Sequence, residues 1–197
     1  MLRVTAVLIV GLTLLVGCAN LTVEQAEPPS TPISTFIQRL DDPNQADITY
    51  SAKQVYQRGP GVADADGIPP DRVGWTLLGL ENRVSGVRRY RLTLALAYEN
   101  DQTAGYRSYD HAKVMPNGPA LTVQPYSRKS GLCTGYATTE CFRQEVVFVW
   151  LPEAVLKGAG PGGLSLEVGG QIGRIWQFTV PDSLIQALFA KMDQYRS

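Results

Sequence analysis

The segment from Arg89 to Glu99 places a large apolar residue at every second position. The positions that share this apolar face are Tyr90, Leu92, Leu94, Leu96 and Tyr98. Because successive side chains of a β-strand point to opposite faces, the pattern predicts a strand with one face against a core. Strands with a single buried face are typical of antiparallel sheets. This segment therefore directs the chain toward antiparallel β folds.

Similar short segments, separated by turns rich in Gly, Pro and Asp, predict further strands at 47–57, 73–80, 106–114, 121–126, 145–151, 164–168 and 175–180. The segment 145–151 is apolar on both faces, which indicates a central strand. After Pro181 the apolar residues take helical spacing, and Asp182 suits the first turn of a helix. We therefore expect a mainly β fold, an antiparallel β-sandwich of immunoglobulin-like character, with one C-terminal amphipathic helix at 182–195.

The chain begins with a positive residue, Arg3, and an uncharged run over 4–16. This run is shorter than the roughly 20 residues that a membrane-spanning helix needs, and it is typical of a secretory signal. The run ends in Leu15-Val16-Gly17-Cys18, which resembles the lipobox of bacterial lipoproteins. The resemblance implies cleavage before Cys18, a diacylglyceryl group on its thiol, and an acyl chain such as palmitate on the freed amine. In Gram-negative lipoproteins an Asp directly after the lipidated Cys favours retention in the inner membrane. This chain has Ala19 at that position, so the resemblance implies passage to the outer membrane, with the protein facing the periplasm.

These features divide the chain into a signal peptide over 1–17, a lipidated Cys18 with a flexible, Pro-rich tether over 18–45, and one β domain over 46–197. Within the tether, the segment 34–40 predicts one or two helical turns. Lys and Arg total 18 and Asp and Glu total 18; removing Arg3 with the signal leaves 17 against 18. Such a balance gives no general attraction to nucleic acid, so the expected partners are the membrane and another envelope protein.

The two remaining cysteines, Cys133 and Cys141, are expected to form a disulfide, because disulfides persist in exported proteins. A zinc site would need further Cys or His ligands, and the chain has one His. A redox pair would need the closer Cys-x-x-Cys spacing. We expect no metal and no cofactor.

Three further patterns resemble sites that carry chemistry. The one imidazole, His111, follows Asp110, and strand alternation would point these two side chains to opposite faces. The segment 158–163 has the spacing Gly-x-Gly-x-x-Gly, but a predicted strand follows it, so we interpret it as a loop. The segment 64–67 resembles the start of a calcium loop, yet Trp75 stands where the closing Glu would be needed.

The residues that best suggest a partner surface are Tyr109, Tyr126, Arg128 and Tyr136, because aromatic residues and Arg are favoured at protein interfaces. The arginines at 88, 89 and 91 fit a solvated sheet face better than an anion patch. The sequence therefore predicts a lipid-anchored envelope protein of non-enzymatic binding or assembly type. The alternative is a periplasmic hydrolase or peptidoglycan-active enzyme that uses Asp110, His111 and Glu145.

Overall fold

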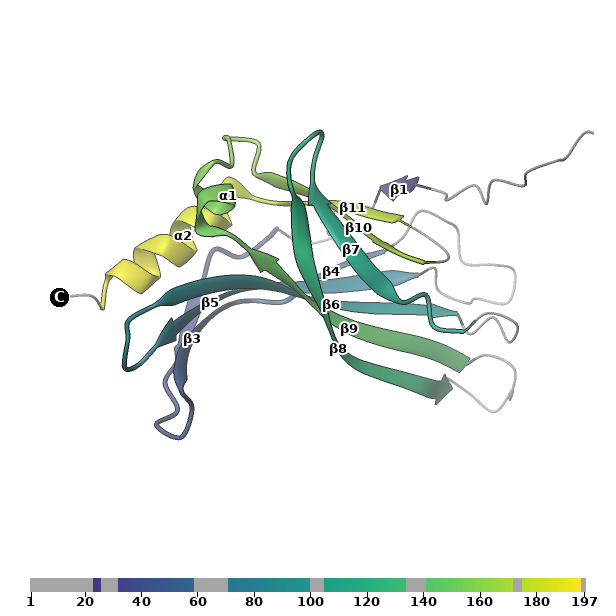
Figure 1. The fold of residues 1–197 in the computed structure, drawn as a ribbon, viewed down its shortest axis with the longest axis horizontal. Coiled ribbons are helices and arrows are strands. Elements are labelled where there is room, and N and C mark those ends of the chain that lie inside the picture. Colours follow the sequence, from purple (N-terminus) through teal and green to yellow (C-terminus); the bar gives the residue numbers. More distant parts are fainter. Residues whose placement is uncertain are drawn as a thin grey trace, which may run out of the picture.

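The computed structural model describes residues 23–25, 32–58, 71–99, 105–133, 141–171 and 175–195. Within these ranges the chain forms eleven strands in one sheet and two short helices (Figure 1). The strands are β1 (Val23–Gln25), β2 (Ile37–Leu40), β3 (Asp47–Ala52), β4 (Val55–Arg58), β5 (Arg72–Asn82), β6 (Arg88–Glu99), β7 (Tyr109–Val114), β8 (Ala120–Cys133), β9 (Cys141–Leu151), β10 (Leu164–Gly170) and β11 (Ile175–Val180). The helices are α1 (Glu153–Lys157) and α2 (Asp182–Asp193).

The strand order along the sheet is β1-β11-β10-β7-β8-β9-β6-β5-β3-β2, and β4 pairs with β5 beside β3. Neighbouring strands are antiparallel except β1 and β11, which are parallel. The long strand β8 joins the two halves of the sheet. It pairs with β7 through its first two residues and with β9 over most of its length.

The sheet curls, so that β10 and β11 lie over β5, β6 and β9 (Figure 1). The rings of Trp75 on β5 and Phe178 on β11 stack with centroids 6.1 Å apart. Trp75, Leu92 and Val149 have no exposed surface, and they belong to one apolar core that both halves of the sheet share. Burial of this shared face is what holds the curled sheet closed.

Helix α2 covers the core at one end and packs on β2, β3 and β5. Its apolar stripe consists of Leu184, Ile185, Leu188 and Met192, all with no exposed surface. The helix lies close to β5 because Gly79 has no side chain: a Cβ at this position would lie 2.4 Å from Sδ of Met192. The expected C-terminal amphipathic helix is thus confirmed.

The mainly antiparallel β fold is also confirmed, whereas the immunoglobulin-like sandwich is not: the strands form one continuous sheet. The helical turns expected at 34–40 are wrong, since residues Ile37–Leu40 form strand β2, which pairs with β3. Ile37 is buried in the core. The sheet therefore includes residues before 46, the boundary expected from the sequence. Helix α1, which follows Pro152, was not expected.

Candidate binding surface

The face of the sheet turned away from the core carries a group of aromatic and arginine side chains on β6, β8 and β9. We call this group the aromatic–arginine face, and its members are Arg89, Arg91, Tyr126, Phe148 and Trp150. The strand register brings them together, because Arg91 is paired with Trp150, and Gln124, near Tyr126, is paired with Phe148. Their neighbours in sequence, such as Leu92 and Val149, point into the core.

The side chains of this face contact one another as a continuous row. The rings of Tyr126 and Phe148 stack with centroids 4.6 Å apart. The guanidinium carbon of Arg91 lies 3.9 Å from the centroid of Phe148 and 5.8 Å from that of Trp150. The guanidinium carbon of Arg89 lies 5.7 Å from the centroid of the Trp150 ring. Cations over aromatic rings are attracted by the ring quadrupole, so the row is an ordered surface.

Tyr126 lies at a β-bulge of β8. Pro125 pairs with Val147 and Ser127 pairs with Val146, so Tyr126 is an additional residue in β8 without a partner on β9. A bulge interrupts the alternation of side chains and changes the direction of one of them. Tyr126 is 67% exposed, and it extends the row toward solvent.

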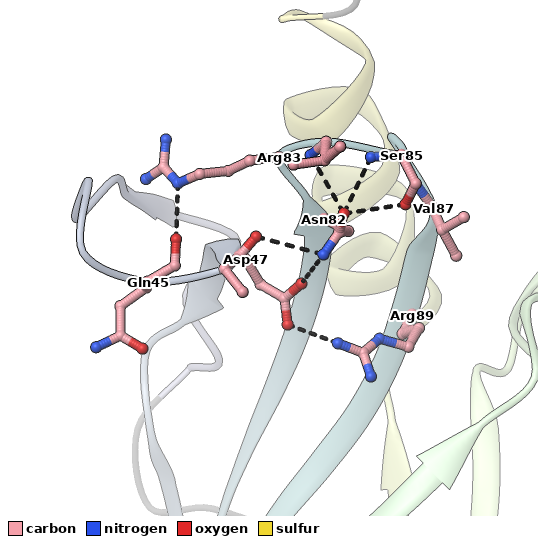
Figure 2. Close-up of polar contacts among 9 residues, drawn as sticks. Gln45, Asp47, Asn82, Arg83, Ser85, Val87 and Arg89 are labelled. Carbon is pink, nitrogen blue, oxygen red and sulfur yellow. Dashed lines mark hydrogen bonds and ion pairs between the residues drawn. The ribbon is translucent and has the colours of Figure 1, made fainter.

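Arg89 is held in place by a hydrogen-bond network at the turn between β5 and β6. Figure 2 shows Asp47 between Asn82 and Arg89. The side-chain amide of Asn82 donates to Oδ1 of Asp47 at 3.2 Å, and Arg89 donates to Oδ2 at 2.6 Å. Oδ1 of Asn82 also accepts hydrogen bonds from the backbone of Val84 and Ser85. The turn is therefore tied to β3, and Arg89 is directed toward Trp150.

Arg91 differs from its neighbours because its side chain makes no hydrogen bond or ion pair with any residue that the structure describes. Its Nε atom is buried. Burial lowers the pKa of Arg91 below its ordinary value, since a charged group loses hydration when it is covered. The face thus carries a half-buried cation that no described carboxylate contacts in an ion pair, although the charge of Asp47 still acts on it from further away.

A cleft of about 310 Å³ lies at one end of the face. It shares Arg89 and Trp150 with the aromatic–arginine face, and its remaining lining residues are Arg88, Tyr90, Ala120, Leu121, Thr122, Leu151, Pro152 and Glu153. This volume is at the lower end of the range of about 300–1,000 Å³ for ligand pockets. It is large enough to receive an apolar side chain of a binding partner.

The residues that the sequence suggested for a partner surface differ in their exposure. Tyr109 is wrong as a surface residue: it is 1% exposed, and its hydroxyl accepts a hydrogen bond from Nε1 of Trp176 at 3.2 Å. Tyr126 is exposed, as expected. Arg128 is also exposed, and it forms an ion pair with Glu145 at 3.3 Å. Tyr136 lies outside the described residues.

Asp110 and His111 lie together on the outer side of β7, contrary to the expectation from strand alternation. Oδ1 of Asp110 is 3.1 Å from Nδ1 of His111. The reason is a second bulge: His111 pairs with Gly169 and Tyr109 pairs with Gly170, so Asp110 is an additional residue. Hydrogen bonds first from Gln171 and then from His111 lower the pKa of Asp110.

Glu145 is not joined to this pair. Its side chain is buried, and its Oε1 atom accepts hydrogen bonds from the Tyr98 hydroxyl at 2.5 Å and from the backbone N–H of Ser108 at 3.0 Å. No hydrogen bond or ion pair within the described ranges connects Glu145 with Asp110 or His111. The structure therefore does not assemble these three residues into one catalytic site.

Several expectations concern residues whose side chains the structure does not describe. Cys18 and the segment 64–67 lie outside the described residues. The backbones of Cys133 and Cys141 pair directly across β8 and β9, but their side chains are not described, so the disulfide stays a prediction. The segment 158–163 forms a turn and leads into β10, as a loop would.

Neither a metal-binding cluster nor a membrane-spanning helix is found among the described residues. No group of three or more His, Cys, Asp and Glu side chains among them could hold a metal ion. In the same residues, no helix is long and apolar enough to cross a membrane.

No family model, curated protein sequence or solved structure matches this chain. Sequence reasoning missed Phe148, which is 8% exposed, and the half-buried Trp150 as members of the aromatic–arginine face, because they lie in a run that is apolar on both faces. Alternation from the core residue Val149 could have assigned both side chains to the opposite face.

Proposed function

We propose that this chain is a lipid-anchored, non-enzymatic protein of the bacterial envelope that binds another envelope protein through its aromatic–arginine face. The observation that carries the proposal is the ordered row of Tyr126, Phe148, Arg91, Trp150 and Arg89 beside a cleft. Trp, Tyr and Arg are the residue types that contribute most to protein interfaces. A row whose members contact one another also loses little side-chain freedom on binding.

The anchor is proposed from the lipobox-like segment that ends in Cys18. One acyl chain binds a membrane only marginally, whereas two or three hold a protein there stably. The Pro-rich residues that follow Cys18 then serve as a tether, which lets the β domain reach a partner away from the membrane surface. In this proposal the protein is at the outer membrane and faces the periplasm.

A disulfide between Cys133 and Cys141 is part of the proposal and is supported by their pairing across β8 and β9. Directly opposed residues of antiparallel strands have Cα atoms about 4.5–5.5 Å apart, which lies within the range that a disulfide requires. The bond would close the connection between β8 and β9 and limit its unfolded conformations. An oxidising compartment such as the periplasm would maintain it.

A periplasmic hydrolase is the second candidate function, and the contact between Asp110 and His111 favours it. An imidazole oriented by a carboxylate can act as a general base. Gly169 allows the imidazole to lie close to β10, since a Cβ there would be 2.2 Å from Nε2 of His111. Glu145 has no role in this version, because its carboxylate bonds to Tyr98 and Ser108. Loss of a hydrolytic activity in His111→Ala would be its test.

Photo-crosslinking in the native envelope tests the binding function. Tyr126 is replaced by a photoreactive phenylalanine analogue, and the matched control places the same analogue at Tyr56, which is also 67% exposed but lies on β4. We expect a discrete protein adduct from position 126, absent from position 56 and lost when Cys18→Ala removes the anchor. Equal adducts from both positions, or none from position 126, would reject this surface.

A further inference from the structure

We propose that the aromatic–arginine face binds an acidic polypeptide segment, in which a carboxylate pairs with Arg91 and a neighbouring apolar side chain enters the cleft beside Trp150. The inference rests on the proposed function and names the chemistry of its partner. It starts from Arg91, whose guanidinium forms no ion pair within the described part of the chain.

Two neighbouring arginines of β6, Arg88 and Arg89, form ion pairs with carboxylates, in contrast to Arg91. Arg88 forms ion pairs with Glu81 at 2.8 Å and with Asp193 at 2.5 Å. Arg89 forms an ion pair with Asp47 at 2.6 Å. Arg91 lies on the same strand, yet no described carboxylate or carbonyl accepts a hydrogen bond from its side chain. Arg91 is therefore the cation of this face that is available to an external anion.

The position of Arg91 would strengthen a contact with such an anion. The guanidinium lies against the Phe148 ring, and Nε is already buried. The loss of hydration that normally opposes ion pairing has thus been partly incurred in the free protein, as the lowered pKa of Arg91 indicates. A carboxylate can accept two parallel hydrogen bonds from the planar guanidinium, which makes the pair directional.

The polar groups around Arg91 favour a polypeptide over a carbohydrate. Sugar hydroxyls require hydrogen-bond acceptors beside an open aromatic ring. On this face the Asp47 carboxylate already accepts from Asn82 and Arg89, and Oε1 of Gln124 accepts from Nε1 of Trp150 at 3.2 Å. The Phe148 ring is in contact with both Tyr126 and Arg91. A carboxylate with apolar neighbours therefore fits the remaining chemistry better than a neutral sugar.

The cleft gives the segment a second point of attachment. Its lining includes Leu121, Leu151 and Trp150, together with Arg89. A buried apolar anchor beside a charge contact is the usual arrangement of an energetically important interface site. The two contacts together would select a segment with an acidic residue close to an apolar one.

Binding of defined polymers to the purified full-length chain tests the inference. The probe is a fluorescent random copolymer of Glu and Tyr, compared with a copolymer of Lys and Tyr and with polygalacturonate, an acidic polysaccharide. We expect measurable affinity for the Glu–Tyr copolymer alone, weakened about tenfold by Arg91→Gln. The matched control is Lys53→Gln, which removes the same charge from an exposed residue between β3 and β4 and should change the affinity by less than about twofold.

A second variant keeps the test valid if Arg91→Gln does not fold. Thr122→Glu adds a negative charge to an exposed position of the cleft lining and should weaken binding of the acidic copolymer to a similar extent. Unchanged affinity in both variants would overturn the inference. Polygalacturonate binding as tightly as the copolymer would also overturn it, in favour of an acidic glycan.

The crosslinking experiment tests the binding function, and the polymer experiment tests the preference for an acidic segment, so each proposal can be rejected without the other. An adduct from position 126 without any effect of Arg91→Gln on polymer binding would leave the binding function standing and reject the acidic segment. Arg91-dependent polymer binding without an adduct in the envelope would reject the proposed envelope partner and keep the preference for acidic polypeptide.

Discussion

The Tyr98 hydroxyl donates a hydrogen bond of 2.5 Å to Oε1 of Glu145, and neither side chain is more than 2% exposed. Tyr98 is on β6 and Glu145 is on β9, and the same carboxylate oxygen accepts the backbone N–H of Ser108 just before β7. Burial and then the hydrogen bond to Glu145 raise the pKa of Tyr98, so its hydroxyl remains a donor at all ordinary pH values. The hydrogen bond from Ser108 links this pair on β6 and β9 to the start of β7, which belongs to the other half of the curled sheet.

Tyr98→Phe should lower the free energy of unfolding by about 1.5–3 kcal/mol, the range for hydrogen bonds to a charged group. The variant keeps the ring and removes a donor from a buried carboxylate, which is left with fewer partners. Chemical denaturation of the two proteins measures the difference.

Tyr56→Phe is the matched control, since its hydroxyl donates to Gln54 at an exposed site. Its unfolding free energy should stay within about 0.5 kcal/mol of the wild type. Equal effects in the two variants would mean that the contact with Glu145 adds nothing to stability.

The contact between Lys113 and Glu167 should make stability depend on pH. Burial raises the pKa of Glu167, but hydrogen bonds from Lys113 and Gln177 outweigh this effect, so the pKa lies below its ordinary value. The folded state therefore favours the ionised form. The resulting stability is complete above the unfolded pKa of about 4.3 and is lost as the pH falls through the lower folded pKa.

Lys113→Met should flatten this part of the pH profile of the unfolding free energy, because the folded pKa of Glu167 rises toward or above its unfolded value. Lys53→Met, at an exposed position without such a contact, serves as the control and should keep the wild-type slope. Identical slopes for Lys113→Met and the wild type would show that Lys113 does not stabilise the ionised form of Glu167.

The sequence predicted strands and helices correctly where one face of the element packs on the core along its whole length. The strand predicted at 89–99 is β6 with one more residue at its start, and the helix predicted at 182–195 is α2 with two fewer at its end. In both segments one face meets the core along the whole length, so the period is undisturbed. The segment 34–40 was assigned wrongly, because a short edge strand is defined by its pairing with β3 and not by its own pattern.

The side-chain directions on β7 and β8 could be predicted only in part, because each of these strands carries a bulge. Tyr126 and Asp110 are each an additional residue opposite a partner strand. A bulge is a property of two paired strands, here β8 with β9 and β7 with β10, and the pattern of one strand alone does not show it. Tyr109 was misassigned for a related reason: its neighbours are polar, but the strand turns its ring inward to Trp176.

Asn82→Ala should destabilise the turn between β5 and β6 by about 1–3 kcal/mol. The change removes the acceptor of the backbone groups at Val84 and Ser85 and the donor to Asp47 (Figure 2). Hydrogen exchange should show faster exchange of the turn amides and of the adjacent part of β6. Asn44→Ala is the control, because its side chain bonds only to Asp42 among the described residues and is exposed; comparable loss there would argue against a specific role of Asn82.

Gly79→Ala should lower the free energy of unfolding by about 1–3 kcal/mol through overpacking. The new methyl group would lie 2.4 Å from Sδ of Met192 and 3.2 Å from Cδ1 of Leu188, and both residues are completely buried against β5. Met192→Ala alone should also destabilise, because it leaves a cavity under α2. The double variant should lose less stability than the sum of the two, since the shortened side chain makes room for the added methyl group. Strict additivity of the two changes, measured by denaturant unfolding, would show that helix α2 does not rest on Gly79 in solution.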